Sequence, residues 1–184
     1  HADTALLPIE PLYTQADAEL ALKQFKGIPY DKPFTLFDKI TVTFREAGHV
    51  LGSALTVIEV KEEGKIKRLV YTGDLGRSRV PILKDPYQLK QTDFLLTEST
   101  YGNRTHPPLE EGIPALGRVI NRTVKKGGKI LIPAFALERT QELIYGLHSL
   151  IKQKEIPANL PIFIDSPLAS GITSVFKRHM ELYD

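Results

Sequence analysis

The stretch AGHVLGS, residues 47–53, places His49 in a glycine-containing turn directly after a β-rich run. Two further stretches repeat this arrangement: TGDLGR carries Asp74 after one apolar run, and TESTYG carries Glu98 after another. Histidine and carboxylate side chains are common ligands and proton carriers in hydrolytic metal sites. We therefore expect all three side chains to gather at one end of a β-sheet.

The first half of the chain has the hydrophobic alternation of a sheet. Alternating apolar and threonine residues, and short apolar runs, predict strands at residues 40–44, 54–60, 67–71 and 94–97, the last one buried. Glu62-Glu63-Gly64-Lys65 predicts a hairpin turn between the second and third strands. Helix-forming residues at 16–25, preceded by Thr14 as N-cap, predict a short helix.

The pattern changes near residues 100–108, where we expect a domain boundary. Beyond it, strands and helices alternate in the order helix 111–124, strand 129–132, helix 137–154, strand 161–164 and helix 168–182. Such alternation is typical of a parallel sheet covered by helices. The fold class expected for the whole chain is therefore α/β.

Composition excludes several classes of protein. The 184 residues carry a net charge of +2, so no overall excess of positive charge predicts nucleic-acid binding, and attraction to phosphate requires local patches. No apolar run approaches the roughly 18 residues that span a membrane. The sequence contains no cysteine, which excludes disulfides and thiolate zinc sites and fits a reducing compartment. We expect a cytoplasmic protein.

Each candidate residue also has a structural interpretation. His49 is alternatively a loop histidine with a structural hydrogen bond. Asp74 is alternatively a turn aspartate that bonds its own backbone, and Glu98 a strand-end residue that caps the next turn. A glutamate at the end of a buried strand would have its pKa raised by desolvation unless it has a partner. Arg77 is either a solvated surface residue or a phosphate contact.

Two stretches in the second half join an expected strand to an expected helix. They are IPAFALERTQE, residues 132–142, and DSPLA, residues 165–169. Helix N-termini attract anions, although Pro133 and Pro167 remove two donors and Ser166 also fits an ordinary N-cap. The candidate substrate contacts in the whole chain are Arg77, Ser99, Tyr101, Arg139 and Ser166.

Taken in order, AGHVLGSA, TGDLGR, TESTYGNR, IPAFALERTQEL and DSPLA closely resemble the β-CASP branch of the metallo-β-lactamase superfamily. This branch includes RNA-processing nucleases such as ribonuclease J and the cleavage and polyadenylation endonuclease. The resemblance implies a partial αββα metallo-β-lactamase sandwich at residues 1–103. It implies the first part of a β-CASP α/β cap domain at residues 104–184.

The resemblance also implies roles for the three side chains. His49 would be a zinc ligand, Asp74 would bridge two zinc ions, and Glu98 would act in catalysis with a downstream histidine. The HxHxDH cluster of the family would precede residue 1, and later cap motifs would follow residue 184. We therefore expect an internal fragment that is inactive when isolated.

The expected function is that of a zinc-dependent phosphodiesterase of RNA processing or degradation, using two zinc ions in the complete enzyme. RNA is the expected substrate, with single-stranded DNA as the alternative, and a homodimer is left open. The competing class is a non-catalytic RNA-binding or scaffolding subunit with the same fold. A plain metallo-β-lactamase relative that hydrolyses a small ester, thioester or lactam is disfavoured, because it would lack the α/β segment after Gly102.

Overall fold

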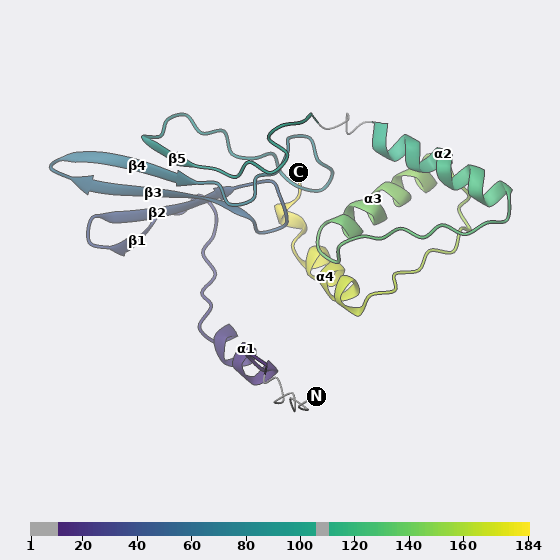
Figure 1. Ribbon diagram of the computed structural model, residues 1–184, viewed down its shortest axis with the longest axis horizontal. Helices are drawn as coiled ribbons and strands as arrows, with labels where there is room; N and C mark the ends of the chain where they lie inside the picture. Colours follow the sequence, from purple (N-terminus) through teal and green to yellow (C-terminus); the bar gives the residue numbers. More distant parts are fainter. Residues whose placement is uncertain (1–10, 106–110) are drawn as a thin grey trace, which may run out of the picture.

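The computed structural model describes residues 11–105 and 111–184, which form a sheet lobe (residues 34–105) and a helical lobe (residues 111–184) (Figure 1). The sheet lobe contains β1 (Phe34–Phe37), β2 (Ile40–Glu46), β3 (Ala54–Glu62), β4 (Lys65–Tyr71) and β5 (Phe94–Leu96). The helical lobe contains α2 (Gly112–Lys125), α3 (Arg139–Lys152), α4 (Pro167–Arg178) and a 3₁₀ turn, η2 (Met180–Leu182). A separate helix, α1 (Gln15–Leu22), lies away from both lobes in Figure 1.

The sheet is a meander in which each strand pairs with the next, in the order β1-β2-β3-β4-β5. The first three pairings are antiparallel, and β5 joins parallel to β4. The turn between β3 and β4 uses positive φ angles at Glu63 (47°) and Gly64 (76°), as a tight hairpin turn requires. The hairpin predicted at residues 62–65 is therefore confirmed, whereas the edge strand β1 was not predicted.

The central strands of the sheet are better packed than the edge strand β5. Val42, Leu55 and Val70 are at most 4% exposed and come from the three central strands. The prediction that residues 94–97 form a buried strand is wrong. Strand β5 forms, but Phe94, Leu95 and Leu96 are each more than half exposed, because no helix in the described part of the chain covers them.

The helical lobe has its own small core. Ile120 of α2 packs with Leu147 and Leu150 of α3 and with Ile156 in the following loop. Gly117 allows the close approach of the two helices, since a Cβ atom there would lie 3.2 Å from a methyl group of Leu150.

In α1, the predicted N-cap Thr14 forms a capping box with Asp17, but no residue of that helix is buried.

The second pair of predicted strands does not form. Residues 129–132 and 161–164 run as unpaired chain beside the helices, and within the described residues neither has a backbone hydrogen-bond partner. Leu131 is 95% exposed and Phe163 is 87% exposed. The parallel sheet predicted for this half is therefore wrong for this structure. A strand is stabilised by pairing with a neighbour and by burial, and the described chain offers these segments neither.

The C-terminal residues connect the two lobes. Leu83 forms a β-bridge with Tyr183, the Asp184 amide donates to the Ile82 carbonyl at 3.1 Å, and Leu83 itself is 3% exposed. Figure 1 shows the C-terminus beside the end of the sheet where β2 ends and β3 begins. The helical lobe is thus anchored next to the candidate site.

Across residues 11–105 and 111–184, every helix is too short or too polar to span a bilayer.

Candidate functional site

The candidate site is built around the loop between β2 and β3, residues 46–53, here called the His49 turn. Inside it, the amides of His49 and Val50 both donate to Ser53 Oγ at 3.2 Å. The Gly48 amide donates to Glu46 Oε1 at 2.7 Å. These bonds fix the backbone on both sides of His49, whose side chain remains solvent-accessible.

Neighbouring segments hold the His49 turn from outside. Tyr30 Oη donates to the Ser53 carbonyl at 2.7 Å, and the Gly76 amide donates to the Ala47 carbonyl at 2.9 Å. Burial raises the pKa of the Tyr30 hydroxyl, so this donor keeps its proton. No motif in the sequence around Tyr30 indicates that its side chain reaches this turn.

His49 and Asp74 are brought together as expected. His49 Nε2 lies 3.9 Å from Asp74 Oδ2, and the carboxylate is 79% exposed. In the described structure the Asp74 side chain makes no hydrogen bond to its own turn, so the alternative of a self-bonded turn aspartate is not observed. An imidazole and a carboxylate held this close offer a divalent cation two donors at once.

Glu98 supports the loop that carries Asp74. Its Oε1 accepts a hydrogen bond from the Leu75 amide at 2.6 Å. This bond, reinforced by hydrogen bonding to Thr100 and by nearby His49, lowers the pKa of Glu98. Desolvation does not dominate, because β5 is exposed and the carboxylate has partners, so Glu98 is ionised at neutral pH.

The backbone of Glu98 is also tied to the Asp74 loop. Its amide donates to Thr72 Oγ1 at 3.3 Å, and Thr72 Oγ1 in turn lies 3.3 Å from Thr97 Oγ1. Thr72 is only 3% exposed. The ends of β4 and β5 are thus locked side by side, which places His49, Asp74 and Glu98 at one end of the sheet.

The donor chemistry fits a zinc ion, but the set is small. Imidazole nitrogen and carboxylate oxygen are ordinary zinc donors, and a fixed zinc site has about four ligands. Within residues 11–105 and 111–184, no group of three His, Cys, Asp or Glu side chains gathers as a metal site. His49 and Asp74 are therefore compatible with part of a metal site that needs further donors.

The other candidate substrate contacts lie in different surroundings. Ser99 and Tyr101 are exposed in the loop after Glu98, and Arg77 is partly buried beside Asp74. Tyr101 has a positive φ angle of 58° and lies beneath the guanidinium of Arg104, 5.1 Å from the ring centre. Ser166 Oγ accepts from the Ala169 amide at 3.1 Å, so it is the N-cap of α4.

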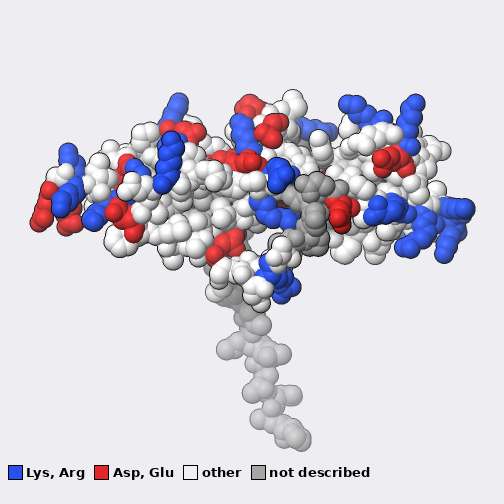
Figure 2. All heavy atoms as spheres, turned by 90° about the horizontal axis from the view of Figure 1, so that it is seen from above, with Lys and Arg blue, Asp and Glu red and all other residues white. Residues whose placement is uncertain are grey.

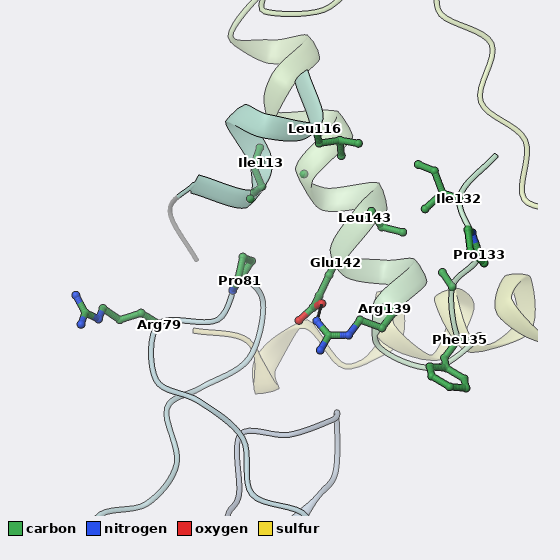
Figure 3. Close-up of a pocket in the computed structure, with 13 residues that line it drawn as sticks. Arg79, Pro81, Ile113, Leu116, Ile132, Pro133, Phe135, Arg139, Glu142 and Leu143 are labelled. Atoms are coloured by element: carbon green, nitrogen blue, oxygen red, sulfur yellow. Dashed lines mark hydrogen bonds and ion pairs between the residues drawn. The ribbon is translucent and has the colours of Figure 1, made fainter. Parts of the chain in front are cut away.

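Arg139 lines a cavity of about 710 Å³ between α2, α3 and the 132–135 segment (Figure 3). Its guanidinium pairs with Glu142 at 2.7 Å across the first turn of α3. The remaining wall is mainly apolar, with Ile113, Leu116 and Leu143 labelled in Figure 3. Pro81 of the sheet lobe also borders this cavity, which therefore has walls from both lobes.

Glu138, to which the sequence alone assigns no role, reaches the site from the helical lobe. It precedes α3, is 5% exposed, and its Oε2 accepts from the Leu51 amide in the His49 turn at 3.3 Å. Burial, with a smaller contribution from the neighbouring Glu142, raises the pKa of Glu138 to about 7, although the hydrogen bond from the Leu51 amide opposes this shift. The motif that contains Glu138 was noted, but a contact across 87 positions has no local signal.

The chain is similar in sequence to several known proteins. The Beta-Casp domain family matches residues 140–184. The chain is 36% identical over 169 residues to Ribonuclease TTHA0252 of Thermus thermophilus, covering 92% of this chain and 37% of that protein. It is 34% identical over 179 residues to Cleavage and polyadenylation specificity factor 73 of Drosophila melanogaster, covering 92% of this chain and 24% of that protein. It is also 32% identical over 173 residues to the Transcription termination factor FttA of Methanocaldococcus jannaschii, covering 91% of this chain and 27% of that protein.

The described chain thus has a mixed α/β fold that gathers a histidine and two carboxylates at one end of a sheet, beside a helical lobe. This chain belongs to the β-CASP branch of the metallo-β-lactamase superfamily. It spans between about a quarter and about a third of the length of the relatives just described.

Proposed function

We propose that this chain is part of a zinc-dependent nuclease that hydrolyses phosphodiester bonds in RNA. The observation that carries the proposal is the convergence of His49, Asp74 and Glu98 at one end of the sheet. The relatives described above include Ribonuclease TTHA0252, which supports a nuclease over other metallohydrolases.

In this proposal His49 and Asp74 would hold metal, and Asp74 would be a ligand of both ions. Two zinc ions at such a site would activate water and neutralise charge on the phosphate oxygens. Glu98 keeps the Asp74 loop in place through the Leu75 amide and remains ionised at neutral pH. A carboxylate so held can also orient a histidine supplied by another part of the protein.

The surface charge supports an anionic substrate. Figure 2 shows Lys and Arg side chains gathered at one end of the molecule, whereas acidic and basic side chains are mixed elsewhere on that face. Exposed basic residues on α2 and just after it include Arg118, Arg122, Lys125 and Lys126. Such side chains attract the phosphate backbone without reading sequence.

The test uses the full-length protein with an end-labelled RNA oligonucleotide. Asp74→Ala should lower the cleavage rate at least roughly a hundredfold, because it removes a ligand shared by both metals. Asp38→Ala is the matched control, since Asp38 is an exposed aspartate in the turn at the other end of the sheet and should leave the rate unchanged. Equal cleavage by wild type and Asp74→Ala would refute the assignment. Wild-type protein that binds the RNA tightly without cleaving it would favour the non-catalytic alternative.

A further inference from the structure

Glu138 combines three features that an ordinary helix-start residue lacks. It is 5% exposed, its Oε1 has no hydrogen-bond partner within the described structure, and its φ angle is 65°. The left-handed region disfavours residues with a side chain, and an unpaired buried carboxylate oxygen is costly. A position that retains both is a candidate for a role beyond packing.

The second oxygen of Glu138 has a definite partner. Oε2 accepts from the Leu51 amide at 3.3 Å, and Leu51 lies two residues after His49. Within the described residues, every other hydrogen bond that holds the His49 turn comes from the turn itself or from segments that precede the helical lobe, including Tyr30, Gly76 and Tyr87. The Glu138 bond is thus the contact through which the helical lobe reaches the turn.

Helix α3 starts directly after Glu138, so the same residue sets where that helix begins. Its first turn carries Arg139 and Glu142, which line the cavity between the helices (Figure 3). A displacement of the His49 turn would therefore displace the start of α3, and a displacement of the start of α3 would displace the His49 turn. We infer that Glu138 is a positioning residue that holds the His49 turn through the Leu51 amide and couples its placement to the start of α3.

The hydrogen-bond part of this inference stands on the structure alone, and only its consequence for metal binding rests on the proposed function. The experiment therefore has two readouts. Amide hydrogen exchange at Leu51, resolved to single residues by mass spectrometry, reports the bond directly. The affinity of the full-length protein for Zn²⁺ reports whether the bond serves the proposed site.

Three substitutions separate the contact from the backbone strain. Glu138→Ala and Glu138→Gly both remove the acceptor, but glycine also relieves the left-handed conformation and so preserves folding. Both should speed Leu51 exchange by roughly tenfold or more, the scale of one lost hydrogen bond. Glu138→Gln keeps an acceptor oxygen at the same reach and should restore Leu51 exchange to within about threefold of wild type.

Gln141→Ala is the matched control. Gln141 is 4% exposed on the same helix, also has an unpartnered buried oxygen, and bonds Ala136 and Thr173 within the helical lobe. It should leave Leu51 exchange unchanged. Unchanged exchange in a folded Glu138→Gly protein, or equal acceleration by Gln141→Ala, would overturn the inference.

The Zn²⁺ measurement then tests the consequence. Glu138→Gly should weaken Zn²⁺ affinity by roughly tenfold to a hundredfold, as expected when the support of a metal ligand is removed. Faster Leu51 exchange with unchanged Zn²⁺ affinity would mean that the hydrogen bond from the Leu51 amide to Glu138 does not position His49 for metal binding. If wild-type protein binds Zn²⁺ independently of His49, the proposed function fails, while the exchange data still decide whether Glu138 holds the turn.

Discussion

Gly76 lies directly against the backbone of Gly48. A Cβ atom built on Gly76 would stand 1.7 Å from the Gly48 carbonyl oxygen and 2.0 Å from its carbon, far inside van der Waals contact. The Gly76 amide meanwhile donates to the Ala47 carbonyl at 2.9 Å. The loops that carry His49 and Asp74 are therefore in direct backbone contact, which only a residue without a side chain permits.

Gly76→Ala should consequently destabilise the chain by roughly 3 kcal/mol or more, because backbone atoms must move to admit the methyl group. Gly171→Ala is the control: it lies within α4 with no atom within 4 Å of the new Cβ. That substitution should stabilise by about 0.5–1 kcal/mol through helix propensity. Urea unfolding of both variants gives the comparison, and a Gly76→Ala midpoint equal to wild type would contradict the geometry.

Glu98→Gln in the full-length protein should lower the cleavage rate while leaving the metal content nearly unchanged. The glutamine can still accept from the Leu75 amide but loses the charge that would keep a nearby histidine protonated. The expected loss is roughly 10²–10⁴-fold, with the basic limb of the pH–rate profile moved to lower pH. Turnover and a pH profile that both match wild type would reduce Glu98 to a loop support.

Glu138 should make stability depend on pH in a defined window. Its pKa is raised to about 7 from an ordinary value of 4.5, so the folded state prefers the protonated acid. The stabilisation is then fully present below pH 4.5 and is lost as pH rises through about 7. The size of the loss is on the order of 3 kcal/mol.

Glu138→Gln has no such titration, so the difference in unfolding free energy between it and wild type should change across this window and be flat above pH 8. Taking the difference removes the contributions of other groups, including Glu46, whose pKa burial also raises. A difference that stays constant from pH 4.5 to 7 would show that the Glu138 carboxyl titrates normally.

The unpaired segments of the helical lobe predict contrasting effects of one kind of substitution. Phe163 is 87% exposed, so Phe163→Ser should change the unfolding free energy of the 184-residue chain by less than about 0.5 kcal/mol. Phe176 is 4% exposed on α4, and Phe176→Ser should cost roughly 3 kcal/mol or more. Chemical denaturation of the two variants measures both changes in unfolding free energy. Similar losses of stability in the two variants would mean that the Phe163 side chain is packed against other residues in solution.

Metal binding by the 184-residue chain should be weak. His49 and Asp74 supply two donors, fewer than the roughly four ligands of a fixed zinc site. After desalting, mass spectrometry should find less than one zinc ion per chain, and His49→Ala should lower even that amount. Two tightly held zinc ions per chain would mean that other residues complete the site.

Short-range features were predictable because they depend on neighbouring residues. Gly64 indicates the hairpin between β3 and β4, and Thr14 indicates the start of α1. His49 and Asp74 were recognisable because each sits in a glycine-containing turn after an apolar run. Their separation of 3.9 Å agrees with the expectation that they lie at one sheet end, while their roles as ligands stay a prediction.

Long-range features were not predictable in the same way. Lys129 to Ile132 has the composition of a strand, but pairing depends on a neighbour that the segment itself does not specify. The bond from Leu51 to Glu138 joins residues 87 positions apart, and no local pattern contains that information. The strand β1 was missed because its turn, Asp38-Lys39, uses a positive φ at a lysine rather than at a glycine.

The serial order of the strands has a consequence for how the protein is made. Because every strand pairs with the one just before it, the strands can pair one after another while the chain is still leaving the ribosome. The contact from Gly76 to Ala47 needs only 23 further residues after the His49 turn, which ends at residue 53, whereas the contact to Glu138 closes a much longer loop. The His49 turn is thus shaped early during synthesis and receives the bond to Glu138 only later, after residue 138 has emerged.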